Sequence, residues 1–80
     1  MNNVNDEELA LQRQVGKRIR EIRLAKGISQ ERLAHEIGLH RTYVGSLERG
    51  ERNPSLQVVS RLAKLLEVST DRLLSMREHD

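Results

Sequence analysis

The chain has 80 residues, no cysteine and a formal net charge of +2 at neutral pH. A chain of this length forms one domain and buries only about 60–65% of its extended surface, so self-association would help it. Without cysteine it can build neither a disulfide nor a thiolate metal site, which suits the reducing cytoplasm. No apolar run reaches the roughly 18 residues of a membrane span, and the acidic start MNNVNDEELA is unlike a signal peptide. We therefore expect a soluble cytoplasmic protein with no membrane partner.

The first predicted helix covers residues 7–26 and ends at Gly27, because glycine adopts a left-handed C-cap at the lowest cost. Its apolar stripe has helical spacing: Leu11, Val15, Ile19 and Ile22. A second, short helix follows Ser29, a good N-cap, and stops at Gly38. Its buried face comprises Leu33, Ala34 and Ile37.

The third helix is predicted over residues 42–49, with Val44 and Leu47 inward and Gly50 as its stop. The Asn-Pro pair in ERNPS indicates a loop. Ser55 then opens a fourth helix, whose predicted inner side is Leu56, Val59, Leu62, Ala63 and Leu66. A fifth helix begins at Ser69 and holds Leu73, Leu74 and Met76.

These elements predict an all-α fold of five helices in a single domain over residues 1–80, frayed at about 1–6 and 77–80. Only GLH separates the second helix from the third. Two helices joined by so short a glycine-containing turn form a helix-turn-helix, here at about residues 29–49. The second helix of that motif enters the major groove of DNA.

Charge is unevenly distributed along the chain. The first 12 residues carry three acids, whereas residues 13–29 carry six Lys or Arg against Glu21 alone. Two interpretations remain open from this pattern, a solvated helix face or a surface that faces phosphates.

The block ISQERLAHEIGLHRTYVGSLERG, followed by NPS, resembles the Cro and phage-repressor type of helix-turn-helix proteins. The likeness runs from about Gly16 to Leu74 and implies a lambda-repressor-like DNA-binding domain. Within that family, HRTYVGSLERGERNPS is similar to the controller proteins of bacterial restriction-modification systems, which are dimeric autoregulators. The resemblance therefore implies an activator, a repressor or both, which binds a pseudo-palindromic operator as a homodimer.

Five residues are candidates for contacts with DNA bases: Arg41, Thr42, Tyr43, Ser46 and Arg52. A positive charge at a helix start opposes the helix dipole, so Arg41 needs another purpose, and bidentate bonding to guanine is the commonest specific contact. Thr42 is either the N-cap or a groove contact, or both. Tyr43, the only aromatic residue, is expected to face outward. Arg52 reaches either a groove edge or a phosphate.

Four residues are candidates for contacts with the DNA backbone: Gln30, His40, Arg49 and Asn53. Gln30 opens the second helix, where its amide and the helix N–H groups suit a phosphate oxygen. A solvated histidine is the competing interpretation of His40. Arg49 and Asn53 follow the third helix, where backbone contacts fix register without reading sequence.

Glu48 lies next to the inward Leu47, and a carboxylate near a core requires a partner. The resemblance implies that Arg23 is that partner and that this structural ion pair ties the first helix to the third. It also implies that Glu31 contacts the RNA polymerase sigma factor during activation, although His35 stands where related activators carry a second acid.

A homodimer is expected because one helix-turn-helix reads too few base pairs. The predicted dimerisation region is residues 65–76, with Leu65, Leu66, Val68, Leu73, Leu74 and Met76 as its apolar side chains, although several of these are expected to belong to the core. The three histidines do not have the spacing of a metal site, no catalytic constellation is evident, and we expect no cofactor and no enzyme. Two competing functions use the same fold: a protein-interaction module, such as an antitoxin or adaptor, and a nonspecific nucleoid binder.

Overall fold

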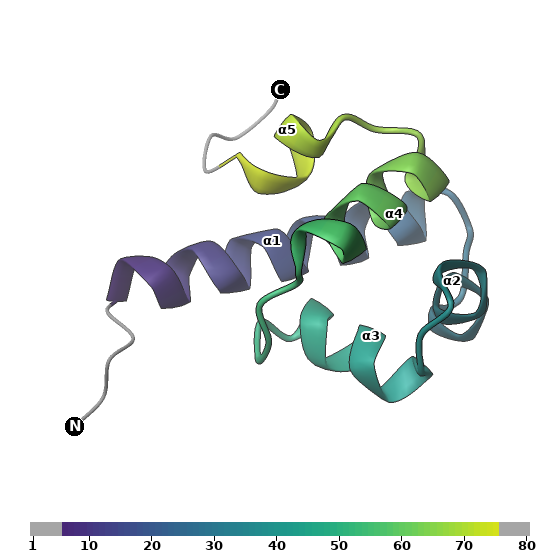
Figure 1. The fold of residues 1–80 in the computed structure, drawn as a ribbon, viewed down its shortest axis with the longest axis horizontal. Helices are drawn as coiled ribbons and strands as arrows, with labels where there is room; N and C mark the ends of the chain where they lie inside the picture. The colour runs from purple at the N-terminus through teal and green to yellow at the C-terminus, as the bar shows by residue number, and fades with distance from the viewer. Residues whose placement is uncertain (1–5, 76–80) are drawn as a thin grey trace.

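The computed structural model describes residues 6–75, which form five helices (Figure 1). In chain order they are α1 (Asp6–Ala25), α2 (Gln30–Ile37), α3 (Arg41–Glu48), α4 (Leu56–Leu66) and α5 (Thr70–Leu74). The all-α architecture is as predicted. The expected frayed ends lie outside the described residues except for Asp6, which begins α1. No helix within residues 6–75 is long and apolar enough to cross a membrane.

Local capping chemistry sets most helix boundaries. Ser29, Ser55 and Ser69 are N-caps whose hydroxyl oxygens accept backbone N–H bonds at 3.0, 3.1 and 3.0 Å. Gly38 ends α2 with a φ of +73°, a left-handed conformation that other residues adopt only at a cost. Leu39 then donates its N–H back to the carbonyl of Ala34, which reverses the chain into α3. The turn of the helix-turn-helix is therefore encoded locally.

The third helix starts one residue earlier than predicted, because His40 and not Thr42 is its N-cap. The imidazole Nδ1 of His40 accepts the backbone N–H of Thr42 at 3.1 Å. The other end of the helix closes one residue earlier than predicted, at Glu48, because the chain turns through Gly50 at a φ of +75°. The N-cap interpretation of Thr42 was wrong, and Thr42 lies in the first turn.

All five helices contribute to one core. Figure 1 shows α1 running through the middle, with α5 along one side and α3 along the other, while α2 closes one end. Neighbouring contacts join α2 to α3 and α4, and α4 to α5. The largest fully buried side chains come from every helix: Ile19, Leu33, Val44, Leu47, Leu62, Leu66 and Leu73.

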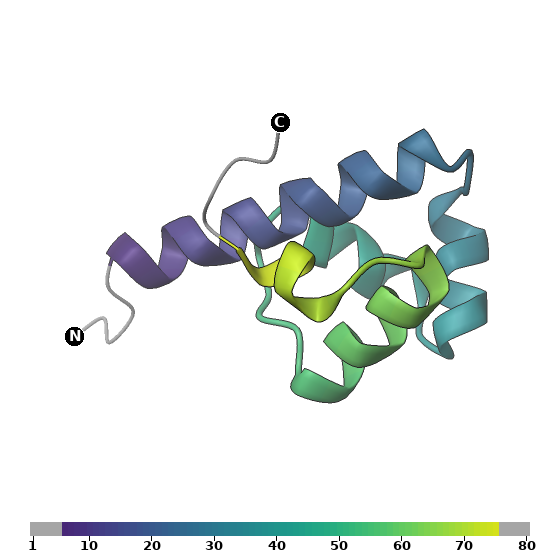
Figure 2. The ribbon, with the colours of Figure 1, turned by 90° about the horizontal axis from the view of Figure 1, so that it is seen from above.

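Two residues expected in the core are exposed. Leu56 is 83% exposed because it occupies the first turn of α4, on the side away from the core, and Val58 is buried instead. Leu11 is 39% exposed. The first turns of α1 extend beyond the other helices (Figures 1 and 2), so the apolar stripe there lacks a partner within the described chain.

Candidate nucleic-acid interface

A close crossing with α1 fixes the position of α3. A β-carbon added at Gly16 would lie 2.1 Å from the carbonyl oxygen of Leu47 and 2.9 Å from that of Glu48. Gln12 also donates its side-chain amide to the carbonyl of Gly50 at 2.8 Å, just past the end of α3. The sequence held one signal of this crossing, because a glycine inside a helical pattern costs about 1 kcal/mol against alanine and its presence favours a packing role.

A buried hydrogen-bonded cluster then locks the same end of α3. The structure brings the expected pair together: Arg23 Nε and Nη2 donate to the Glu48 carboxylate at 2.6 and 3.0 Å. The two side chains are only 7% and 2% exposed. Gln30 Nε2 donates to the same carboxylate at 2.9 Å, and Arg23 Nη1 donates to the Ile28 carbonyl at 2.8 Å. The pair therefore joins α1, α2 and α3, and sequence analysis missed the glutamine.

That cluster changes the surroundings of Gln30. Gln30 is the first residue of α2, as expected, and it is half-buried. An amide nitrogen carries two hydrogens, and Glu48 accepts one of them. A phosphate contact by Gln30 stays a prediction.

The start of α3 presents its polar groups outward. Arg41 and Glu31 are 62% and 75% exposed, and their Nη1 and Oε1 atoms lie 3.5 Å apart. The sequence pattern had indicated different partners for these two residues, and their pairing was not predicted. Exposed ion pairs of this kind contribute about 0–1 kcal/mol to stability, so Arg41 can leave Glu31 for another partner at little cost.

A shallow hollow of about 590 Å³ lies along α3 and the loop after it. Its lining residues are His40, Thr42, Tyr43, Ser46, Arg49, Glu51 and Arg52. Six of these seven are residues that sequence analysis assigned to DNA. Arg41 and Asn53 are exposed outside this lining.

Tyr43 forms part of the floor of the hollow and does not simply face outward. It is half-buried and packs against the core, and the Arg52 guanidinium lies 5.8 Å from the centre of its ring. A cation over an aromatic face is held by about 0.5–1 kcal/mol at exposed sites. The face of the Tyr43 ring is therefore a partner of the Arg52 guanidinium.

Ser46 is 8% exposed, and its hydroxyl donates to the Tyr43 carbonyl within α3 at 2.7 Å. The hydroxyl hydrogen is thus used inside the helix, and only the oxygen lone pairs could accept from a base. The predicted base contact by Ser46 stays a prediction, restricted to that accepting role.

Glu51 is the lining residue that sequence analysis did not identify. Its carboxylate accepts two bonds from Arg49, from Nε at 3.0 Å and from Nη2 at 3.2 Å. The bonds to Arg49 are the main reason why the pKa of Glu51 is lowered, and the same bonds raise the pKa of Arg49. Both groups are therefore charged at neutral pH.

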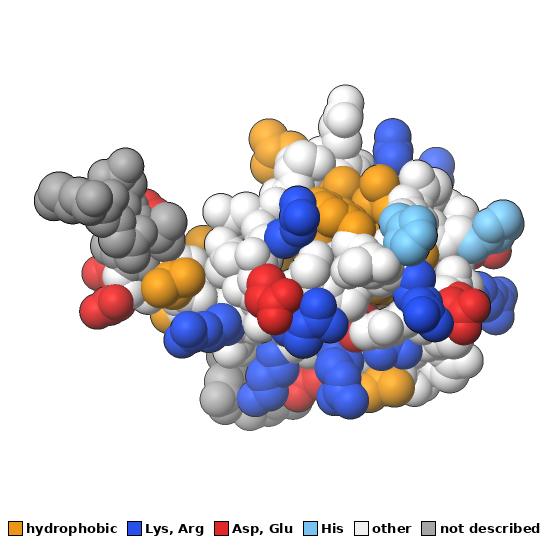
Figure 3. All heavy atoms as spheres, turned by 90° about the horizontal axis from the view of Figure 1, so that it is seen from below, with side chains coloured by type: hydrophobic (Ala, Val, Ile, Leu, Met, Phe, Trp, Pro, Cys, Tyr) orange, Lys and Arg blue, Asp and Glu red, His pale blue; other side chains and the backbone are white. Residues whose placement is uncertain are grey.

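Figure 3 looks onto the α3 side of the molecule, where Lys and Arg side chains spread across the face and acidic side chains stand beside some of them. The Arg41–Glu31 and Arg49–Glu51 ion pairs are of this kind. This face therefore carries many positive side chains, and two of its arginines form ion pairs with glutamates. Such a surface suits a polyanion, because paired arginines can exchange one oxyanion for another.

A sequence profile described as helix-turn-helix matches residues 19–73. The chain belongs to the helix-turn-helix family. This family match spans the Arg23–Glu48 pair, the α2–α3 turn and the hollow. The expected family resemblance is confirmed.

Among the relatives, control protein C.BamHI of Bacillus amyloliquefaciens is 48% identical over 60 residues, which is 74% of either chain. The crystal structure of restriction-modification controller protein C.AhdI from Aeromonas hydrophila is similar, with a TM-score of 0.74 and 48% identity, over 78% of this chain and 94% of that one. The biofilm regulator SinR in complex with DNA is also similar, with a TM-score of 0.73 and 37% identity, over 76% of this chain and 98% of that one. The narrower resemblance to controller proteins is likewise confirmed.

The predicted dimerisation region of this helix-turn-helix chain needs correction. Leu66 and Leu73 are 0% exposed, so both side chains are enclosed by their own core and cannot form a partner-facing surface. Leu65 and Val68 are half-buried, and Leu74 is 39% exposed. Met76 lies outside the described residues. The apolar side chains left for an interface are therefore Leu65, Val68 and Leu74.

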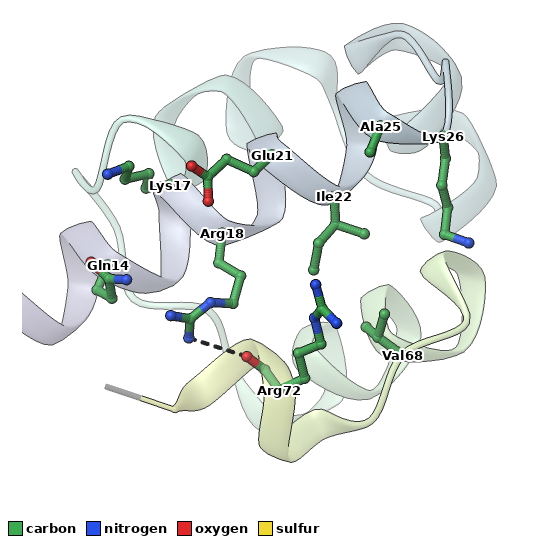
Figure 4. A pocket seen from close by; sticks show the side chains of 9 residues that line it. All are labelled: Gln14, Lys17, Arg18, Glu21, Ile22, Ala25, Lys26, Val68 and Arg72. Atoms are coloured by element: carbon green, nitrogen blue, oxygen red, sulfur yellow. Dashed lines mark hydrogen bonds between the residues drawn. The ribbon is translucent and has the colours of Figure 1, made fainter. Parts of the chain in front are cut away.

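A second groove, of about 720 Å³, lies between α1 and α5 (Figure 4). Arg18 points across it from α1 and donates to the carbonyls of Arg72 and Ser75 at the end of α5. This buried arginine satisfies the last carbonyls of α5, a capping role suited to its positive charge. Within residues 6–75, no three His, Asp or Glu side chains gather as metal ligands.

Proposed function

We propose that this chain is a transcription regulator that binds double-stranded DNA through α3 and acts as the controller of a restriction-modification system. It works in the cytoplasm, on a pseudo-palindromic operator, as a homodimer. The observation that carries the proposal is the hollow along α3, a helix that a buried cluster holds in place. His40, Thr42, Arg49 and Arg52 present donors there, from the helix, its two ends and the loop after it.

The rigid support of α3 matters for base reading. A bidentate arginine–guanine contact requires both N–H groups in line with O6 and N7, which an unanchored short helix would not maintain. The Arg23–Glu48–Gln30 cluster and the Gly16 crossing supply that anchorage. Arg41 at the first position of α3 then projects toward the groove, and Tyr43 supports Arg52.

A homodimer gives the required specificity. The eight residues of α3 span about 12 Å, which covers only a few base pairs. Two copies with their α3 helices about 34 Å apart read half-sites one turn of DNA apart. Leu65, Val68 and Leu74 are the apolar residues that the partner would cover.

The controller assignment draws on C.BamHI and C.AhdI, which are named as control or controller proteins and match most of this chain. By that likeness, the chain regulates its own synthesis together with that of its restriction-modification genes. The sign of regulation follows from where the operator lies relative to the promoter.

Activation is proposed to use Glu31, which faces solvent at the start of α2 and would meet the RNA polymerase sigma factor. Because Glu31 also pairs with Arg41, the variant must separate the two roles. Glu31→Gln should reduce activation from a reporter promoter while operator binding remains within about threefold of wild type. Loss of binding together with activation would reject the polymerase contact.

The experiment that tests the proposed function is selection of bound duplexes from a random DNA pool at about 150 mM salt. We expect a pseudo-palindrome with half-sites about 10 base pairs apart for the wild type. Arg41→Ala should lose a guanine preference at one position of each half-site, a cost of about 1–3 kcal/mol. Arg20→Ala, which removes an exposed arginine of α1 outside the hollow, is the matched control and should keep the preference.

If no sequence is enriched, the proposal is wrong. Binding that falls with salt but ignores sequence would indicate the nonspecific nucleoid binder instead. No DNA binding at all would favour the protein-interaction module, an antitoxin or adaptor on the same fold.

A further inference from the structure

The Arg49–Glu51 pair is built by the chain turn at the end of α3. Residues two apart on a helix do not face each other. Here the residue between them is Gly50, whose φ of +75° reverses the chain, so both side chains lie on the same side. Both are exposed, at 60% and 57% of the side-chain surface, and two bonds of 3.0 and 3.2 Å join them.

The guanidinium of Arg49 folds back along α3 onto a glycine. A β-carbon at Gly45 would lie 3.1 Å from Arg49 Nη1, which is tight contact, so the absence of a side chain there makes room for the planar group. Arg49 is therefore held between Gly45 beneath it and Glu51 at its edge. The guanidinium of Arg49 therefore has a defined position, although much of its surface is exposed.

Glu51 also lies where DNA is proposed to bind. It is the acidic member of the hollow, whose other lining residues include His40, Arg49 and Arg52. A carboxylate and a phosphate present oxygens in the same two-pronged geometry to a guanidinium. Glu51 therefore occupies the Nε and Nη2 edge of Arg49 that a DNA phosphate would use.

We propose that Glu51 is an internal competitor for the DNA backbone: it holds Arg49 in the free protein, and a phosphate must displace it. This inference rests on the proposed function. Competition by Glu51 lowers the affinity for DNA of any sequence. Binding therefore depends more on the bases that Arg41 and its neighbours read. A repulsive element that suppresses unwanted binding is a common way to obtain specificity.

The test is the salt dependence of binding to a random-sequence duplex of about 25 base pairs, measured by fluorescence anisotropy between about 50 and 300 mM salt. Glu51→Gln keeps the size and polarity of the side chain but releases Arg49. We expect Kd to fall about three- to tenfold. The slope of log K against log salt should steepen by about 0.9, the value of one added phosphate contact.

Two further variants make the result specific to the pair. Glu21→Gln changes the net charge equally but lies on the α1–α5 groove, and it should leave both Kd and slope close to wild type. In an Arg49→Gln background, Glu51→Gln should lose most of its effect, because the arginine that it would release is gone.

Three outcomes would overturn the inference. Unchanged or weaker binding by Glu51→Gln would mean that Glu51 supports Arg49 for phosphate and does not compete. An equal gain in the Arg49→Gln background would reduce Glu51 to simple repulsion. A wild type that binds no duplex would overturn the proposed function itself, and this inference with it.

Discussion

Replacing Glu48 by alanine should unfold or loosen the domain before it changes base preference. The Glu48 carboxylate accepts from Arg23 Nε and Nη2 and from Gln30 Nε2, at 2.6, 3.0 and 2.9 Å. Alanine would leave the guanidinium, whose side chain is 7% exposed, without its counter-charge. Removing one partner of a buried pair costs about 3–5 kcal/mol.

That loss is large against the whole stability. A domain of this length is stable by about 4–12 kcal/mol, at about 0.05–0.15 kcal/mol per residue. Each kcal/mol shifts the melting temperature by about 4–8 °C in a domain of this size. Tm should therefore fall by about 12–40 °C in a thermal scan followed by circular dichroism at about 222 nm. Urea unfolding gives the free energy independently.

Two comparisons make the measurement decisive. Glu36→Ala removes an exposed carboxylate from α2 and should change stability by about 0.5 kcal/mol or less. The double variant Arg23→Leu with Glu48→Leu removes both charges and should regain much of the loss. A Glu48→Ala protein that melts within about 3 °C of wild type, or that keeps its stability with a changed base preference, would refute the reasoning.

Three further substitutions test the framework around α3 and the end of α4. Gly16→Ala should cost about 3 kcal/mol or more in urea unfolding, since its methyl group would meet the Leu47 carbonyl at 2.1 Å; a loss below about 1 kcal/mol would contradict the close crossing. His40→Ala should cost about 1 kcal/mol by removing the α3 N-cap, whereas His40→Asn should retain it, and equal losses in both would contradict the capping role. Glu67→Gly should raise Tm by a few degrees, because Glu67 holds a φ of +59° at a cost of about 1–2 kcal/mol and its 3.7 Å pair with Lys26 is exposed; a lower Tm would show that the pair matters more.

The proposed DNA-binding surface depends on residues of α1 and α2 that hold α3 in place. Apart from Gln30, the donors assigned to DNA lie on or beside α3 and in the loop after it, while the groups that hold this helix lie on α1 and α2. Substitution of Arg23 should therefore weaken DNA binding by moving α3, although Arg23 itself does not contact DNA. Separating stability from binding is necessary in every variant of this region.

Local sequence patterns were enough to predict the five helices and most of their ends. Serine N-caps and glycine C-caps act through bonds within a few residues, so Ser29, Gly38 and Ser55 could be assigned correctly without tertiary information. The order of the five helices and the short turn at Gly38 then predicted the helix-turn-helix. Family resemblance supplied the Arg23–Glu48 pair, whose members are 25 residues apart.

Which side chains share a surface depends on how the five helices pack against one another. Periodicity assigns a residue to a helix face but does not say whether another helix covers that face, so Leu66 and Leu73 were expected at a dimer interface and lie in the core, whereas Leu56 was expected in the core and is exposed. The Arg49–Glu51 pair depended on the left-handed turn at Gly50, which brings together two residues that a continuing helix would separate. Contacts of this kind depend on the path of the backbone in space, and that path is fixed only when all five helices pack.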